Sequence, residues 1–440
     1  MRDLAILCIV VACVALAFYR PWLGLLALTV FGYMHPQGYA TGFMQGFPVY
    51  KLQFAAVVGA LVLSRQWRRP PLDWRLIGLA ALWAYFLFTT YHAKVPWAAW
   101  SRFGEVSKIF VALGLTILLI DTRQKLFCLI VTIAASFALV TIKGGYWAVM
   151  TGFADRVYGP PGSQYYDNNL FAIAVIMNIP LLVLWLRETR RPPMRYALTA
   201  VIALSAAAAI SSWSRGAVIA LGVTTVALLW NTRRKYLVVP MVVAAVALAL
   251  AALPETWFER MRTIAAFGQD ASAGSRLDAW RAGVQHALIF PMTGVGLDGW
   301  RYATVTTDWH NSYVEIMAEH GFIAFGLWCL LLFGTMVSLV RLGRTVAGFP
   351  DLVWVGSSGR LLAASLVAFA AGSMFLGLSY WDILYHLIVI SVLLSEVARG
   401  KQSARGAEPR AVDSITARGT ALLVGIGRRG TGRLARIPAP

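Results

Sequence analysis

Charged residues are scarce in this 440-residue sequence. Only 13% of the residues are charged, whereas 59% are hydrophobic, and the mean hydropathy is +0.66. Soluble globular domains carry about 25% charged residues, so this chain lacks the polar surface that a water-soluble fold of its length needs. The composition excludes that class and predicts an all-α polytopic membrane protein.

Cysteines and metal-binding motifs are equally sparse. The four cysteines all lie in apolar runs, which excludes a disulfide framework outside the membrane and matches no metal-ligand spacing; they are Cys8, Cys13, Cys128 and Cys329. The sequence also contains no DxD carboxylate pair, no Walker loop and no HExxH motif. We therefore expect chemistry that needs neither a metal nor a cofactor, with arginine supplying positive charge.

Basic residues are present, but their placement indicates orientation. The formal net charge is +19, and the arginines and lysines cluster at the ends of apolar runs, which argues against nucleic acid as a partner. By the positive-inside rule these clusters are cytoplasmic; they lie at 65–75, 187–195, 233–235, 341–344 and after 399. Alternation then places 92–103, 143–167, 212–214 and a long loop, 253–312, on the periplasmic face of a bacterial inner membrane.

The apolar runs predict 12 or 13 membrane spans, since one span needs about 20 apolar residues. The first two runs are separated only by Tyr19-Arg20-Pro21, so they form either a tight hairpin or one span plus a half-span. The candidate spans are 4–19, 22–34, 49–64, 76–91, 104–120, 125–142, 168–186, 196–211, 215–230, 236–252, 315–340, 360–377 and 380–397.

We divide the chain into three parts. N-terminal membrane helices occupy 1–142, and a catalytic membrane region that includes the 253–312 loop occupies 143–398. The basic tail, 399–440, lacks apolar periodicity, so we expect it to be disordered, cytoplasmic and close to anionic lipid.

Arg215 is the first candidate site residue. The chain crosses the membrane and returns between two basic clusters, which forces a tight turn at 211–216 and places Arg215 at the outer mouth of a helical hairpin. A charge at that depth is costly unless it is paired or faces a wet cavity. The alternative is an arginine that reaches lipid phosphate as an anchor.

Arg276 is the second candidate. Ser275 is placed to cap a helix whose first turn carries Arg276 and Asp278, and a helix N-terminus beside an arginine suits phosphate oxygens. The alternative is a surface pair of Arg276 with Asp278 around a packed Trp280.

His310 and Asn311 end the polar loop, and nine residues separate Asn311 from Gly321. A neutral imidazole takes a proton from a hydroxyl nucleophile, and the neighbouring amide either orients the imidazole or binds sugar hydroxyls. A lone histidine is more often structural. Two arginines and a base on one face, however, fit transfer from a lipid pyrophosphate.

Two further stretches on that face support the site. The segment that opens the span at 168 contains Asp167 and Asn169, although Asp167 or Asn168 is equally suited to be its helix cap. The segment from Lys94 to Lys108 mixes aromatic and basic residues, which fits interfacial anchoring as well as ligand binding.

These motifs together resemble the O-antigen ligase and polymerase-like superfamily of membrane glycosyltransferases. The matching pieces cover about 165–330 and comprise DNNLFA at 167–172, SRG at 214–216, SRLDAW at 275–280, Pro291 with GVG at 294–296, and HN at 310–311 followed by Gly321. The N-terminal third more narrowly resembles O-glycosylation ligases associated with exosortase systems; its matching pieces are RDL at 2–4, RP at 20–21, MHP at 34–36, GF at 42–43 and Pro48.

The resemblance implies a GT-C-type bundle with an undecaprenyl-diphosphate-linked glycan as donor. It further implies that His310 activates an acceptor hydroxyl, that Arg215 and Arg276 hold the diphosphate, and that a single displacement inverts the anomeric carbon. The leading interpretation is a ligase that glycosylates a lipid, protein or polysaccharide hydroxyl. The alternatives are a polymerase of lipid-linked repeat units and a transporter or flippase without chemistry.

Overall fold

The computed structural model describes residues 1–440 apart from 231, 233, 263–270, 303–307 and 402–440. The described residues form helices and turns and contain no strand. The predicted all-α polytopic membrane fold is confirmed.

The N-terminal part is a set of helices joined by short connections. Local sequence signals explain where several of them begin: proline occupies the first turn of α2 and of α5, and Asp73 and Thr122 cap α4 and α6 through their side-chain oxygens. The helices are α1 (Arg2–Tyr19), α2 (Pro21–Met34), α3 (Val49–Ser64), α4 (Trp74–Tyr91), α5 (Pro96–Leu119) and α6 (Arg123–Met150), with a 3₁₀ turn η1 (Pro36–Tyr39).

The second part begins after the 151–167 connection. Its elements are α7 (Asn168–Glu188), α8 (Pro192–Ile210), α9 (Arg215–Trp230), α10 (Lys235–Ala252), α11 (Glu255–Arg262), α12 (Ala271–Ile289), η3 (Gly299–Arg301), α13 (Ser312–Thr345), η4 (Pro350–Leu352), α14 (Val353–Gly372) and a last helix, Asp382–Lys401.

Each of the thirteen candidate spans overlaps a helix, although the last five residues of the candidate span 360–377 lie beyond the end of α14 at Gly372. Eight helices in the described part of the chain are long and apolar enough to cross a membrane, and three apolar helices are shorter. The eight are α1, α6, α7, α8, α10, α13, α14 with the preceding η4, and the last helix; the shorter three are α2, α3 and α9. The helices α4 and α5 belong to neither group.

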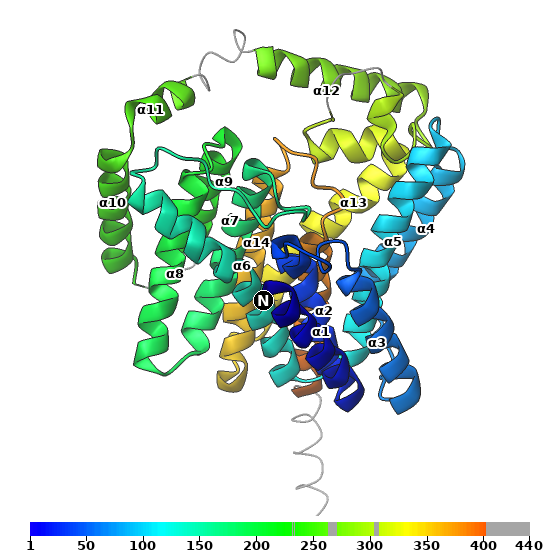
Figure 1. The fold of residues 1–440 in the computed structure, drawn as a ribbon, viewed down its shortest axis with the longest axis horizontal. Coiled ribbons are helices and arrows are strands. Elements are labelled where there is room, and N and C mark those ends of the chain that lie inside the picture. Colours follow the sequence, from blue (N-terminus) through cyan, green and yellow to red (C-terminus); the bar gives the residue numbers. More distant parts are fainter. Residues whose placement is uncertain (231, 233, 263–270, 303–307, 402–440) are drawn as a thin grey trace, which may run out of the picture.

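The helices differ in how much of their surface other helices cover. Buried residues make up 72% of the most apolar 18-residue window of α7, of α14 and of the last helix, but 0% of the window of α10. A helix that is apolar all round and uncovered by protein needs lipid around it. The helices α7 and α14 and the last helix therefore form the centre of the bundle, and α10 forms part of its rim (Figure 1).

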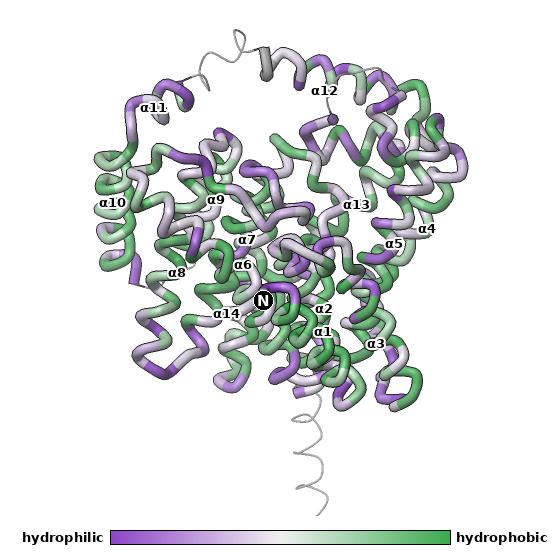
Figure 2. Tube along the Cα trace, viewed as in Figure 1, coloured by the Kyte–Doolittle hydropathy of each residue, from purple (hydrophilic) through white to green (hydrophobic). Residues whose placement is uncertain are grey.

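The polar interval 253–312 is not an irregular loop. It contains α11 and α12, which lie beyond one end of the bundle and are more hydrophilic than the helices below them (Figure 2). Residues 263–270 and 303–307 of this interval lie outside the described residues, as does nearly all of the tail for which disorder is predicted; residues 399–401 belong to the last helix.

Candidate functional site

His310 lies in the turn that leads into α13. Its φ angle is +46°, a left-handed conformation that few non-glycine residues adopt. The next residue, Asn311, caps α13, since its side-chain oxygen accepts hydrogen bonds from the backbone N–H groups of Tyr313 (3.0 Å) and Val314 (3.3 Å). The cap holds the imidazole at the helix N-terminus, and the strained backbone there is typical of functional sites.

The buried side chain of Trp309 holds this turn in place. The Trp309 indole donates to the Glu319 carboxylate at 3.0 Å, and the Trp309 carbonyl accepts from the Trp280 indole at 2.8 Å. Gly283 of α12 leaves no room for a side chain, because a Cβ there would lie 2.5 Å from Val314. The helix α12 therefore docks directly on the segment that carries His310, and the predicted supporting residue Trp280 makes the contact.

Arg276 lies near His310. It shares one face of α12 with Trp280 and Gly283, at spacings of four and seven residues, and its positive charge acts on the imidazole of His310. Ser275 is not the cap that the sequence suggests, because α12 begins at Ala271 and Ser275 lies inside it. Alanines at 271 and 273 favour helix, which explains the earlier start. Asp278 forms an ion pair with Arg281 at 3.2 Å.

Arg215 begins α9, directly after the predicted turn. The Ser214 hydroxyl accepts a hydrogen bond from the Ala217 N–H at 3.3 Å and so caps the helix. Gly216 packs against Phe375, since a Cβ there would lie 2.9 Å from that side chain.

The segment 373–378 connects Arg215 with the His310 turn. Ser312, the first residue of α13, donates from its N–H to the Ser373 carbonyl and from its hydroxyl to the Leu376 carbonyl, both at 2.8 Å. The N-termini of α9 and α13 therefore both contact this segment, on the same end of the bundle.

Asp167 and Asn169 lie at the N-terminus of a third helix, α7. The Asp167 carboxylate accepts from the N–H groups of Asn169 and Leu170, so Asp167 is the helix cap, the alternative that the sequence left open for this segment. Asn168 donates to the Ser212 carbonyl at 2.6 Å and so joins α7 to the turn before Arg215. Three helix N-termini therefore lie around one region, and the positive end of each helix dipole favours an anion there.

The titration of His310 follows from its surroundings. Burial lowers the pKa of the imidazole, the positive charge of Arg276 lowers it further, and the carboxylates of Asp308 and Asp167 act in the opposite direction. Burial also raises the pKa of Asp308, partly offset by the hydrogen bond from the Trp309 N–H and by the positive charge of Arg102. The imidazole is therefore neutral near pH 7, the form that accepts a proton.

Gly321 interrupts α13 and makes room for a packed turn. Its backbone has φ +76° and ψ −175°, outside the helical region, and the segment 291–296 fills the gap. The N–H groups of Val295 and Gly296 donate to the Ala318 and Glu319 carbonyls, both at 2.9 Å. Gly321 therefore allows the segment 291–296 to pack against the His310 end of α13.

Several site groups escaped the sequence reasoning, above all Asp308, Glu315 and Glu319. Glu315 and Glu319 are almost fully buried, accept from the Ser379 N–H (3.1 Å) and the Tyr380 hydroxyl (2.6 Å), and lie one turn apart below the His310 turn. Two acids four residues apart in an apolar run were the available signal, since buried carboxylates in a span are costly. In the described ranges, no group of three or more His, Cys, Asp or Glu side chains is arranged to hold a metal ion.

The family comparison bears on this same region. Residues 198–329 match the O-antigen ligase family. The matched segment contains Arg215, Arg276, His310 and Gly321, and it supports membership of the O-antigen ligase-like superfamily. Residues 1–191 match a family of unknown function (DUF5935), and no curated protein matches the chain. The O-antigen ligase match indicates, at a general level, a membrane glycosyltransferase that acts as a ligase or polymerase on lipid-linked glycan.

Proposed function

We propose that this protein is an inverting glycan ligase that transfers an oligosaccharide or polysaccharide from undecaprenyl diphosphate to a hydroxyl acceptor. The observation that carries the proposal is the neutral base His310 beside Arg276, in a region bounded by three helix N-termini, one of which begins with Arg215. A base and a diphosphate-binding site are the two elements that such a transfer requires.

In the proposed reaction, His310 takes the proton of the acceptor hydroxyl as its oxygen attacks the anomeric carbon of the donor. The bond from that carbon to the diphosphate oxygen breaks, and undecaprenyl diphosphate leaves with the bonding electron pair. Arg215 and Arg276 bind the diphosphate and stabilise its growing charge, so the step needs no metal. One displacement inverts the anomeric configuration.

We also propose that the His310 region faces the periplasm. The basic clusters at 65–75, 187–195 and 341–344 lie at the opposite ends of their helices from the His310 region, which by the positive-inside rule faces the periplasm of a bacterial inner membrane. The N-terminal resemblance to exosortase-associated O-glycosylation ligases makes a protein hydroxyl one acceptor of interest.

The decisive experiment replaces His310 by alanine. Loss of a general base lowers the rate by about 100- to 10,000-fold, and His310→Ala should show that loss while the protein stays folded in the membrane. His286→Ala is the matched control, because His286 lies on α12 with no hydrogen-bond partner for its buried Nδ1, and we expect a mild effect. Transfer is measured with a synthetic undecaprenyl-diphosphate glycan, and normal transfer by His310→Ala refutes the proposed role.

A deletion strain separates the ligase from the polymerase. Accumulation of lipid-linked long chains or of an unglycosylated protein supports a ligase. Accumulation of lipid-linked single repeats indicates the polymerase of the same superfamily and refutes the ligase.

A further inference from the structure

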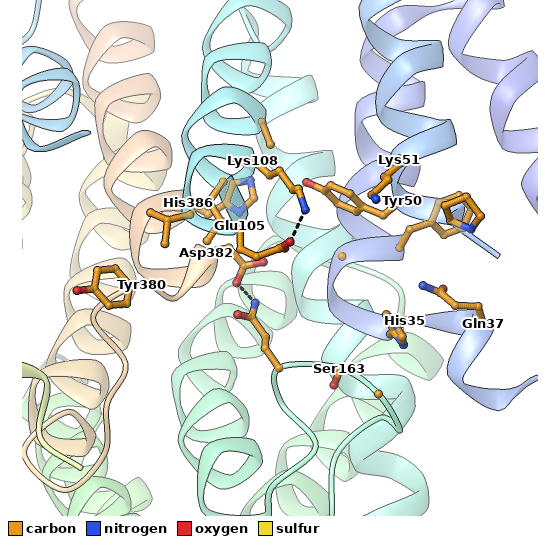
Figure 3. Close-up of a pocket in the computed structure, with 18 of the residues that line it drawn as sticks. His35, Gln37, Tyr50, Lys51, Glu105, Lys108, Ser163, Tyr380, Asp382 and His386 are labelled. Atoms are coloured by element: carbon orange, nitrogen blue, oxygen red, sulfur yellow. Dashed lines mark hydrogen bonds and ion pairs between the residues drawn. The ribbon is translucent and has the colours of Figure 1, made fainter. Parts of the chain in front are cut away.

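A cavity of about 390 Å³ lies between the N-terminal helices and the start of the last helix. Residues of α2, α3 and α5 line it together with the loop at 162–164 and the segment from Tyr380 to His386. Its volume lies within the range of about 300–1,000 Å³ that is common for ligand pockets. Figure 3 shows Tyr50 and Lys51 of α3 on one side and Glu105 and Lys108 of α5 on the other.

One wall of the cavity is built from two loops that fit tightly together. His35 adopts a left-handed conformation with φ +47°, and its Nδ1 lies 3.1 Å from the Pro161 carbonyl oxygen. A Cβ on Gly38 would lie 2.0 Å from the same oxygen. These contacts hold the wall in place without a ligand.

The lining mixes hydrogen-bond donors with acceptors. Lys51 and Lys108 donate; the Glu105 carboxylate accepts from Lys108 at 2.6 Å, and the Asp382 carboxylate accepts from Gln164 at 3.0 Å and from Tyr165. A phosphate offers only acceptors, so it could use the cations Lys51, Arg102 and Lys108 but would leave the two carboxylates without a donor. Sugar hydroxyls both donate and accept, and tyrosine rings such as Tyr50 and Tyr380 suit the apolar faces of sugar rings.

Gln37 gives an independent indication of a ligand. Its side chain lines the cavity, is 7% exposed, and its Oε1 has no hydrogen-bond partner. Buried polar atoms are normally satisfied. Oε1 is shielded from the cavity as the amide is placed, and a half-turn of the amide presents it to a ligand hydroxyl. A hydroxyl then supplies the missing donor, whereas a phosphate oxygen does not.

The cavity also borders the His310 region. Tyr380 lines it, and the Tyr380 hydroxyl donates to one oxygen of Glu319, whose other oxygen accepts from Trp309. We infer that this cavity binds sugar residues of a glycan substrate and leads that glycan toward His310. The inference rests on the proposed function, and the ligand is either the donor's glycan or a carbohydrate acceptor.

Binding of free sugar tests the inference without any transfer reaction. The probes are the glycan released by mild acid from the lipid-linked donors of the host membrane and delipidated surface polysaccharide fragments of the same cells, measured by saturation-transfer NMR on full-length protein in nanodiscs. Gln37→Met keeps the length of the side chain but removes the amide that would bond the sugar, so we expect about 3- to 10-fold weaker binding. Gln45→Met is the matched control, because Gln45 lies exposed in the same loop and does not line the cavity.

The outcomes are distinct. Weakened binding of the released donor glycan assigns the cavity to the donor, and weakened binding of the surface fragments, with no binding of the released donor glycan, assigns it to the acceptor. The inference is overturned if neither glycan binds the parent, if Gln37→Met binds as the parent does, or if Gln45→Met loses as much. It is also overturned if glycerol phosphate occupies the cavity while both glycans do not. Because His310→Ala should bind the sugar normally, failure of the proposed transfer and failure of this inference are separable.

Discussion

Replacing Gly321 by alanine should destabilise the protein and impair transfer together. The backbone at φ +76°, ψ −175° is a region that essentially only glycine occupies, and an L-residue held there costs about 1–3 kcal/mol. The new Cβ would also lie 2.3 Å from the Pro291 carbonyl oxygen, and overpacking of this kind adds about 1–3 kcal/mol. We therefore expect the free energy of unfolding to fall by about 2–6 kcal/mol.

Gly326→Ala is the matched control for this substitution. Gly326 lies five residues further along α13, and a Cβ there meets no atom within 4 Å, so the change should be neutral or stabilise by up to about 1 kcal/mol through helix propensity. Both variants are unfolded by SDS titration of the detergent-solubilised protein, and their transfer rates are measured in parallel. If Gly321→Ala matches Gly326→Ala in both measurements, the kink does not position the His310 turn.

Helix positions were largely predictable from the sequence, because membrane spans need long apolar runs whatever their partners. The turn at 211–216 was predictable for a different reason: the two basic clusters that flank it leave too few residues for anything but a helical hairpin. The internal structure of the polar interval was less accessible. A helix that begins at Ala271 leaves Ser275 inside it, and propensity around alanine outweighs a capping motif there.

The candidate site was predictable only where a residue type carries its own chemistry. His310 and the two arginines stand out in an apolar chain, and the structure places Arg276 near enough to act on the imidazole. The contribution of 373–378 could not be predicted, because Ser373, Phe375 and Leu376 act through backbone carbonyls and packing. Such contacts depend on how distant helices pack and leave no motif.

The residues that line the cavity could not be identified from the sequence either. The mixture of aromatic and basic residues from Lys94 to Lys108 fitted interfacial anchoring as well as ligand binding. The structure places Arg102 and Lys108 of this segment in the lining of the cavity, beside Gln37 and Asp382 from opposite ends of the chain, so the inferred sugar site would include them.

Two further predictions test the arginines and the base. Lys keeps the charge of Arg but loses its bidentate contact with phosphate, so Arg215→Lys and Arg276→Lys should each keep expression but lose about 10-fold or more in transfer and donor binding. Arg234→Lys, in a cytoplasmic cluster, is the control and should have no effect. If Arg215→Lys and Arg276→Lys bind donor and turn over like the parent, the two arginines are only membrane anchors. The last prediction concerns pH. Because burial and Arg276 lower the pKa of His310 below the ordinary 6.5, the free base persists below pH 6.5, and kcat/KM should fall only as the pH drops through that lowered pKa. Arg276→Met removes the positive charge, which raises the pKa of His310 and moves this acid limb to higher pH, while Arg276→Lys leaves it in place. The measurement is kcat/KM from pH 4.5 to 8, about the range in which a histidine titrates. If the acid limb does not move in Arg276→Met, the titrating base is not His310 or Arg276 does not act on it.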